Sequence, residues 1–147
     1  MSKLAAPVNI FSGADTALGA ALTNPTELAR QKGTLTRSYP VLFDGKRYPD
    51  AETAYQLLKA TSVDPHRMMA EVICAKFQQH PDLAQQVADA GGTPWLATCS
   101  HLTQARSPGA QAWEGVGMKS RYIRILVEGY ELFQSGSNTQ NGQAGLF

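Results

Sequence analysis

The chain has 147 residues with a formal net charge of +1, and 43% of the residues are hydrophobic while 17% are charged. This length fits one domain with a single core, the composition is typical of a soluble globular protein, and the low charge gives no reason to expect a long surface for the phosphate backbone of nucleic acid. No window approaches the roughly 20 apolar residues that cross a bilayer, so a membrane protein is excluded.

Small residues and turn signals organise the first third of the chain. Asn24-Pro25 supplies a cap and a first-turn proline for a short helix, and Gly33 ends it. Asp44-Gly45 favours a type I′ hairpin turn because both residues tolerate positive φ. The predicted elements are a strand at 8–11, a small-residue stretch at 12–24 that can approach a ligand, a helix at 26–31, and strands at 39–43 and 46–48.

Two aspartates mark the helices that follow. Asp50 can cap a helix from 51 to about 61, and Asp64-Pro65 begins another that Pro81 stops. Both helices have apolar residues at helical spacing, which predicts their buried sides. These residues are Ala51, Ala54, Leu57 and Leu58 in the first helix, and Met69, Val72, Ile73 and Phe77 in the second.

The last third ends in the longest predicted helix. Residues 81–90 predict a helix, Trp95–Thr98 a buried strand, and residues 100–112 a loop. The final helix follows Gly115-Val116-Gly117, and its inner side is formed by Met118, Tyr122, Ile125, Leu126 and Phe133. The predicted fold class is α+β, a single compact and mostly helical domain with a few short strands at 1–133, followed by a small, polar, flexible tail at 134–147.

The two cysteines and the N-terminus indicate the compartment. Cys74 and Cys99 show neither metal-ligand spacing nor a disulfide framework, so we expect two reduced, buried thiols. The N-terminus lacks the apolar run of a signal peptide. We therefore expect a cytoplasmic protein without a membrane partner, and no residues at metal-binding spacing predict a metal.

Four polar side chains share one side of the helix predicted after Asp50. Glu52, Tyr55, Gln56 and Lys59 stand at i, i+3, i+4 and i+7. One interpretation is a solvated helix surface. The other is the wall of a pocket, because Glu52 and Lys59 are roughly 10 Å apart along the axis and could bracket a small molecule.

The surrounding motifs resemble those of the NADAR family, which typically has a DGxxYPS-like turn followed by EHxYQxxK. The order and spacing are similar over about residues 8–132. The matching segments are Phe11-Ser12, Leu22-Thr23-Asn24-Pro25, DGKRYP at 44–49 with Glu52, Tyr55-Gln56 and Lys59, KFQQHPDL at 76–83, LATCS at 96–100, and Trp113 with Gly115-Val116-Gly117.

The resemblance implies an α+β fold around a nucleotide-sized cleft, and an N-glycosidase acting on ADP-ribose derivatives or ribosylated bases, including ADP-ribosylated guanine in nucleic acid. It implies no metal and no cofactor. By resemblance Glu52 and Lys59 would be catalytic. The implied ligand-binding residues are Ser12, Asn24, Tyr55, Gln56, Trp113, Gly115 and Gly117.

These residue types suit the chemistry. Breaking an N-glycosidic bond builds positive charge on the sugar, which a Glu52 carboxylate can stabilise, or the same group can activate water. Lys59 can contact a phosphate or hydroxyl, or act as a nucleophile; the sequence leaves both open. Trp113 can stack on a base or belong to the core. Gly115 and Gly117 precede a predicted helix N-terminus, where free N–H groups favour an anion.

The chain differs from the NADAR motifs at two positions, and a histidine lies near the cleft that the resemblance implies. The family has histidine after its glutamate, where this chain has Thr53, so proton relay through that residue is unavailable. The family has an aspartate three residues before its tryptophan, where this chain has Ala110. These departures leave a non-catalytic nucleotide-binding or ADP-ribose-binding module as the alternative function. His101 follows the strand that the resemblance places beside the cleft, which leaves a ligand contact there open.

Overall fold

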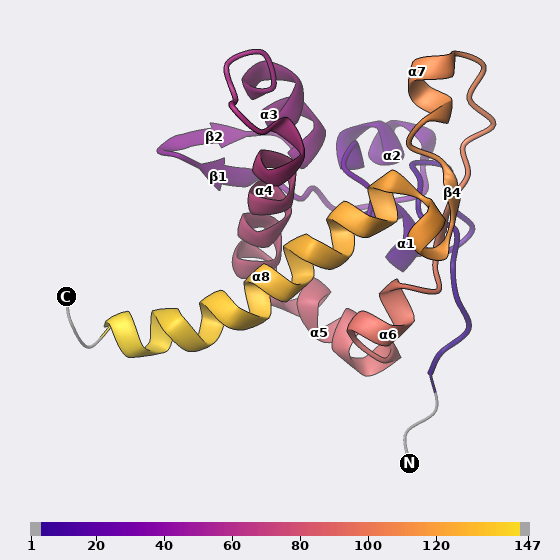
Figure 1. The fold of residues 1–147 in the computed structure, drawn as a ribbon. Coiled ribbons are helices and arrows are strands. Elements are labelled where there is room, and N and C mark those ends of the chain that lie inside the picture. The colour runs from indigo at the N-terminus through magenta and orange to yellow at the C-terminus, as the bar shows by residue number, and fades with distance from the viewer. Residues whose placement is uncertain (1–3, 145–147) are drawn as a thin grey trace.

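Two helices, α4 (Pro65–Gln79) and α8 (Arg121–Ala144), cross and pack against each other at the centre of the fold (Figure 1). The computed structural model describes residues 4–144. Gly129 of α8 lies against Ile73 of α4 so closely that a Cβ added to the glycine would be 2.6 Å from Ile73 Cγ2. The four predicted core residues of α4 are buried, as the helical spacing indicates: Met69, Val72, Ile73 and Phe77.

Shorter elements surround this pair, and the chain is 56% helical with a few short strands, so the α+β, mostly helical class is confirmed. The remaining helices are α1 (Ala17–Ala21), α2 (Thr26–Lys32), α3 (Ala51–Leu58), α5 (Pro81–Ala90), α6 (Thr93–Leu96), α7 (Pro108–Gln111) and the 3₁₀ helix η1 (Gly117–Lys119). The strands are β1 (Val41–Phe43), β2 (Lys46–Tyr48), β3 (Ser100–His101) and β4 (Gly115–Val116).

The predicted hairpin forms from β1 and β2. They pair antiparallel with Val41 opposite Tyr48 and Phe43 opposite Lys46. Asp44 and Gly45 have φ angles of 52° and 80°, so both turn residues have the positive φ that a type I′ turn requires. The turn prediction is confirmed.

A second small sheet joins the N-terminal segment to the chain before α8. β3 and β4 are antiparallel, with His101 opposite Gly115. Residues 8–11, predicted as a strand, make only a parallel bridge, in which Asn9 pairs with Ser100. The Ile10 N–H donates to the Ser100 carbonyl at 2.7 Å, and the Ser100 N–H donates to the Val8 carbonyl at 3.0 Å. The predicted N-terminal strand is thus reduced to this bridge.

The predicted strand at Trp95–Thr98 is wrong. Residues Thr93–Leu96 form α6, with Pro94 in its first turn, where a proline needs no N–H partner. Trp95 is buried as predicted, and its Nε1 donates to the Ala6 carbonyl at 3.0 Å. A short apolar run fits a buried strand or a buried helical turn equally well, so periodicity alone could not separate the two.

Three other local predictions need correction. The 12–24 stretch contains α1, which Thr16 caps by accepting from the Gly19 N–H. The 100–112 loop contains β3 and α7. Two residues predicted to face the core are exposed: Leu57 in α3 by 60% and Met118 in η1 by 46%. Met118 precedes the helix rather than belonging to it, because α8 begins only at Arg121.

The long helix continues beyond its predicted end. Its inner residues Tyr122, Ile125 and Leu126 are buried as predicted. The helix runs on to Ala144, through most of the segment predicted as a flexible tail from residue 134. Residues 145–147 of that tail lie outside the described residues. Both cysteines are free, Cys99 buried and Cys74 partly buried.

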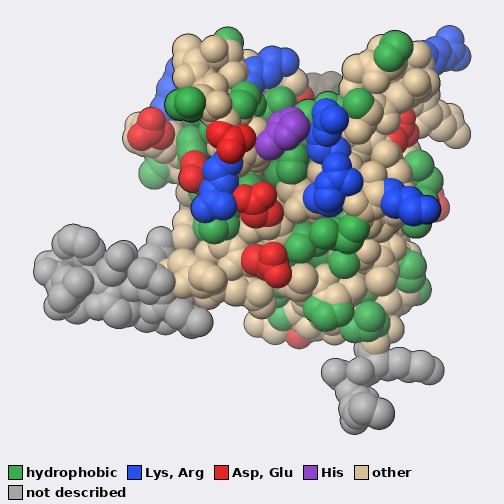
Figure 2. All heavy atoms as spheres, in the orientation of Figure 1, with side chains coloured by type: hydrophobic (Ala, Val, Ile, Leu, Met, Phe, Trp, Pro, Cys, Tyr) green, Lys and Arg blue, Asp and Glu red, His purple; other side chains and the backbone are tan. Residues whose placement is uncertain are grey.

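The surface carries both signs of charge. On the face shown in Figure 2, basic and acidic side chains are interspersed with hydrophobic ones. Arg67 of α4 pairs with Glu71 on its own helix and with Glu128 of α8, at 3.6 and 2.8 Å. Within residues 4–144, none of the helices combines the length and the apolar character needed to span a bilayer.

Candidate functional site

A cavity of about 650 Å³ opens between α3, the start of α2, the β3 segment and the α7 region. This volume falls in the range of small-molecule sites. Seven of the nine residues that the sequence analysis assigns to a site line it, although they come from segments up to 101 positions apart. They are Ser12, Asn24, Glu52, Tyr55, Gln56, Lys59 and Trp113.

The polar side of α3 forms one wall of this cavity. Gln56 Nε2 donates to Glu52 Oε2 at 2.6 Å, and Lys59 Nζ lies 5.7 Å from the centre of the Tyr55 ring. Gln56 and Lys59 remain exposed, while Glu52 and Tyr55 are half-buried. The helix face is therefore both a cavity wall and partly solvated, and its carboxylate lies deeper than its ammonium.

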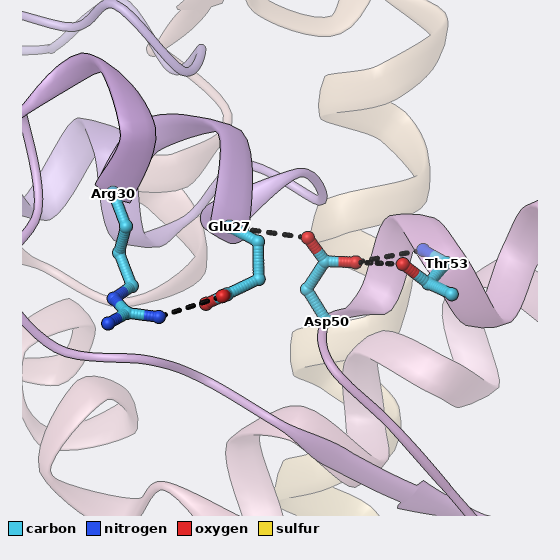
Figure 3. Close-up of polar contacts among 4 residues, drawn as sticks. All are labelled: Glu27, Arg30, Asp50 and Thr53. Carbon is cyan, nitrogen blue, oxygen red and sulfur yellow. Dashed lines mark hydrogen bonds and ion pairs between the residues drawn. The ribbon is translucent and has the colours of Figure 1, made fainter.

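Asp50 positions this wall relative to α2 (Figure 3). Its Oδ1 accepts from the backbone N–H and the hydroxyl of Thr53, at 2.9 and 2.7 Å, as the predicted cap of α3. Its Oδ2 accepts from the Glu27 N–H of α2 at 3.0 Å. The N-cap position of α2 is Pro25 and has no side-chain cap, so the predicted capping by Asn24 is wrong and Asp50 supplies the acceptor.

The backbone of the segment before α2 is bonded to Lys76 of α4, a buried residue that is 2% exposed. Its Nζ donates to the carbonyls of Ala21 and Thr23 at 2.6 and 2.8 Å. Burial lowers the pKa of Lys76 to about 7, while the charge of Asp50 acts in the opposite direction. Lys76 does not line the cavity, so it positions residues 21–24 rather than contacting a ligand.

Asn24 is fixed from two sides. The Tyr122 hydroxyl donates to the Leu22 carbonyl at 2.7 Å and lies 3.1 Å from Asn24 Oδ1. The Asn24 carbonyl accepts from the Glu52 N–H of α3 at 3.2 Å. Burial raises the pKa of Tyr122 strongly, and the charge of Glu52 adds to this, so the phenol stays protonated and can donate.

Trp113 forms an aromatic wall opposite α3. Its ring meets the Tyr55 ring edge-on with centres 6.1 Å apart, and the His66 ring in the same way at 5.3 Å. The Arg121 guanidinium lies 5.3 Å from the Trp113 ring centre. Trp113 is half-buried and packs against the main core, so it serves both of the roles considered for it, as a core contact and as cavity lining.

His101 lines the cavity from β3. Its Nδ1 lies 2.7 Å from the Ile10 carbonyl and its ring packs on Tyr122 with centres 4.9 Å apart. Burial lowers the pKa of His101, while the bond to Ile10 and the charges of Glu114 and Glu52 act in the opposite direction. The contact left open for His101 is thus geometrically available.

Lys32 is a cavity residue that the sequence analysis missed. It lies at the end of α2, and its Nζ donates to Ser12 Oγ at 2.7 Å. Thr34 anchors the same segment by donating its hydroxyl to the Ser12 carbonyl at 2.6 Å. Nothing in the local sequence distinguishes this lysine from an ordinary last-turn lysine, whose charge suits a helix C-terminus.

Gly115 and Gly117 do not line the cavity. The Gly117 N–H donates to the Cys99 carbonyl at 2.7 Å, and a Cβ on Gly115 would lie 2.8 Å from the Ser120 nitrogen. They are needed for close backbone packing in β4 and η1. The N-terminus of α8 is capped by Ser120, whose Oγ accepts from the Ile123 N–H at 3.1 Å.

The departures from the NADAR pattern have different locations. Ala110 lines the cavity, so the replacement of the family's aspartate falls inside the site. Thr53 is absent from the lining and bonds to Asp50. Glu114, beside Trp113, accepts from the backbone N–H groups of Thr103 and Ala105, which lowers its pKa and holds the loop after β3.

The chain matches no protein-family model, no curated protein and no solved structure. The NADAR resemblance therefore remains a prediction. Among residues 4–144, no three His, Cys, Asp or Glu side chains lie together as a metal site would require.

Proposed function

We propose that this protein is an N-glycosidase that hydrolyses the bond between a ribose and a nitrogen in an ADP-ribose-type or ribosylated-base compound. The observation that carries the proposal is the gathering of Glu52, Tyr55, Gln56 and Lys59 with Ser12, Asn24 and Trp113 around one cavity. A cavity of this size, with a few convergent polar groups and an aromatic wall, suits a nucleotide-sized ligand.

Glu52 is the group that stabilises the transition state in this proposal. As the carbon–nitrogen bond breaks, positive charge develops on the anomeric carbon and ring oxygen of the sugar. The charge of Glu52 contributes to the raised pKa values of Tyr55 and Tyr122, after burial, and opposes the lowered pKa of His101. Its field therefore acts on groups around the cavity, where a developing cation would also experience it.

Lys59 acts as a point charge in this proposal. Its ammonium is solvent-exposed, and burial is the usual route by which an enzyme makes a lysine nucleophilic. An exposed ammonium at the rim suits a phosphate or a sugar hydroxyl. Of the two roles that the sequence leaves open, we propose the contact with phosphate or hydroxyl.

A binding module without turnover is the second candidate. The observation that favours it is the position of Thr53, whose hydroxyl donates to Asp50 instead of reaching the cavity. If the chemistry of the resembled family needs the histidine that Thr53 replaces, this chain would retain the pocket and lose hydrolysis. The molecule bound in either case is a small-molecule nucleotide, an ADP-ribosyl compound or a modified base.

The two candidates are separated by incubating the protein with three probes, ADP-ribose, ribosylamine nucleotides and an oligonucleotide carrying ADP-ribosylated guanine. Mass spectrometry then measures free base or ribose phosphate from the two small-molecule probes, and free ADP-ribose together with the unmodified strand from the oligonucleotide. Release supports the glycosidase. A rise in melting temperature with the same probes, without product, supports the binding module. Neither signal with any probe contradicts both candidates.

A further inference from the structure

We propose that His101 is the general base of this site, taking the proton of the attacking water at Nε2 while Glu52 stabilises the sugar cation. This inference rests on the proposed N-glycosidase function. Glu52 and His101 then have separate roles. His101 does not occupy position 53 or 110, two positions at which the chain differs from the NADAR motifs.

The first observation is the hydrogen bond that selects the tautomer of His101. A backbone carbonyl only accepts, so the 2.7 Å contact between Nδ1 and the Ile10 carbonyl places the proton on Nδ1. In the neutral ring Nε2 then carries a lone pair. Among the side chains of residues 4–136 and the backbone of residues 4–144, no hydrogen bond to this Nε2 is found, and the residue lines the cavity. Nε2 is therefore available to water or substrate.

His80 provides a contrast within the same chain. There it is Nε2 that lies 2.7 Å from a carbonyl, that of Pro40, while Nδ1 lies 3.3 Å from Arg37 Nη2. Both ring nitrogens of His80 have protein partners, and His80 lies outside the cavity. His101 combines one nitrogen bonded to the backbone with a second nitrogen that has no protein partner, in a residue that lines the cavity, and this arrangement suits an oriented base.

The second observation is that the backbone around His101 is held by strand pairing on both sides. The neighbouring Ser100 bridges to Asn9, and His101 itself pairs with Gly115 across β3 and β4. The ring rests against Tyr122 of α8 at 4.9 Å between centres. A base placed on paired strands and packed against a buried ring keeps its orientation before substrate arrives.

Electrostatics support the neutral form. Burial lowers the pKa of His101 below the ordinary histidine value, against the opposing effects of the Ile10 bond, Glu114 and Glu52. Glu52 faces the ring from α3, Glu114 from the segment before β4, and Tyr122 from α8. The phenol stays neutral because its pKa is raised. At pH 7 the ring is therefore predominantly unprotonated and able to accept a proton.

The proposed step balances without a cofactor. The oxygen of water forms a bond to the anomeric carbon, and the carbon–nitrogen bond breaks with its electron pair going to the base nitrogen. The proton lost by water passes to Nε2. The resulting imidazolium returns this proton, through solvent, to the released base. The products are the base, which stays in the strand when the substrate is the oligonucleotide, and the ribose compound with a hydroxyl at the anomeric carbon.

His101→Asn tests this role, because the Asn amide can still donate to the Ile10 carbonyl and lacks only the group at the Nε2 position. With the oligonucleotide carrying ADP-ribosylated guanine, we expect kcat to fall by about 100-fold or more, the usual contribution of a general base, with KM changed less than about threefold. In the wild type, kcat/KM should fall as pH drops through the lowered pKa of His101. This acidic limb should vanish in the variant.

His80→Gln is the matched control, because it keeps a donor for the Pro40 carbonyl and should keep both the rate and the acidic limb. Should His101→Asn unfold, His101→Gln replaces it, since its amide cannot accept a proton. Nitrogen NMR of the wild-type histidines should show a proton on His101 Nδ1 and none on Nε2 at pH 7.

The outcomes separate the two claims. An active wild type with an equally active His101→Asn, or with an unchanged acidic limb, overturns the role of His101 and leaves the glycosidase standing. A proton found on Nε2 in the NMR spectrum also overturns it. A wild type that hydrolyses none of the probes contradicts the proposed function itself, and the role of His101 with it.

Discussion

Asp50 Oδ2 accepts a hydrogen bond from the Glu27 N–H at 3.0 Å, so the carboxylate that caps α3 also satisfies the first turn of α2 (Figure 3). This single side chain, 3% exposed, joins α3, which carries Glu52 and is followed by Lys59 at its C-cap, to α2, which carries Lys32. This buried carboxylate therefore helps to fix the relative placement of two cavity walls, together with the hydrogen bond from the Glu52 N–H to the Asn24 carbonyl.

Asp50→Ala should be more destabilising than the loss of an ordinary cap. We expect about 2–3 kcal/mol, because a cap is worth about 1 kcal/mol and the variant also leaves the N–H of Glu27 without its acceptor. Asp64→Ala is the control, since among the described residues the Asp64 side chain accepts from the Arg67 N–H at the start of α4 and does not bridge to a second helix, so its loss should cost about 1 kcal/mol. Urea unfolding measures both, and equal losses would contradict the bridging role.

Gly129→Ala should destabilise the packing of α4 on α8. The new Cβ would meet Ile73 Cγ2 at 2.6 Å and the Ala70 carbonyl at 2.9 Å, so overpacking of about 1–3 kcal/mol should exceed the gain in helix propensity. Gly136→Ala in the same helix meets nothing closer than Gln78 Nε2 at 3.7 Å. It should stabilise by about 0.5 kcal/mol. Thermal unfolding measures whether each variant raises or lowers the melting temperature. A shift in the same direction for both variants would contradict the close packing of Gly129 on α4.

Lys76 should make stability rise with pH above neutrality. Its pKa is about 7 in the folded protein, below its unfolded value of about 10.4. Below pH 7 both states are protonated. Above pH 7 the folded state loses the proton that the unfolded state keeps, so the unfolded state binds more protons and the free energy of unfolding increases.

The size of this effect is about 2 kcal/mol at most between pH 6.5 and 8.5, from a limiting slope of about 1.4 kcal/mol per pH unit. Lys76→Met should lack this contribution. The difference between the wild-type and Lys76→Met curves isolates Lys76 from histidines and thiols that titrate nearby. Losing the donor for the Ala21 and Thr23 carbonyls shifts the whole variant curve but leaves its slope unaffected. Parallel curves would show that Lys76 keeps its proton across this range.

Local signals predicted the elements that present the site. Asp50 and Asp64 cap the helices expected of them, and Asp44-Gly45 makes the expected turn, because caps and type I′ turns depend on a few adjacent residues. The spacing of Glu52 and Lys59 on one helix was equally local. The spacing predicts that these polar side chains share one face of α3. That this face lines a cavity depends on segments far away in the sequence.

Long-range contacts account for what the sequence left undetermined. His101 reaches the cavity because β3 bonds to residues about 90 positions earlier, as in its contact with Ile10. Lys76, named from the sequence only as part of the KFQQHPDL segment, proves to be a buried donor to the carbonyls of Ala21 and Thr23. No local pattern encodes such pairings. Trp95 was correctly predicted as buried but in the wrong element, since burial follows from composition and helix or strand does not.

The most direct test of the central claim is the Glu52→Gln variant with the oligonucleotide carrying ADP-ribosylated guanine, followed by mass spectrometry. Because Gln keeps the shape and removes the charge, we expect product release to fall by about 100-fold or more, with folding unchanged. Glu131→Gln, on the exposed side of α8, should behave as the wild type. Product released at the wild-type rate by Glu52→Gln, or tight binding of the probe by the wild type without any product, would contradict the account.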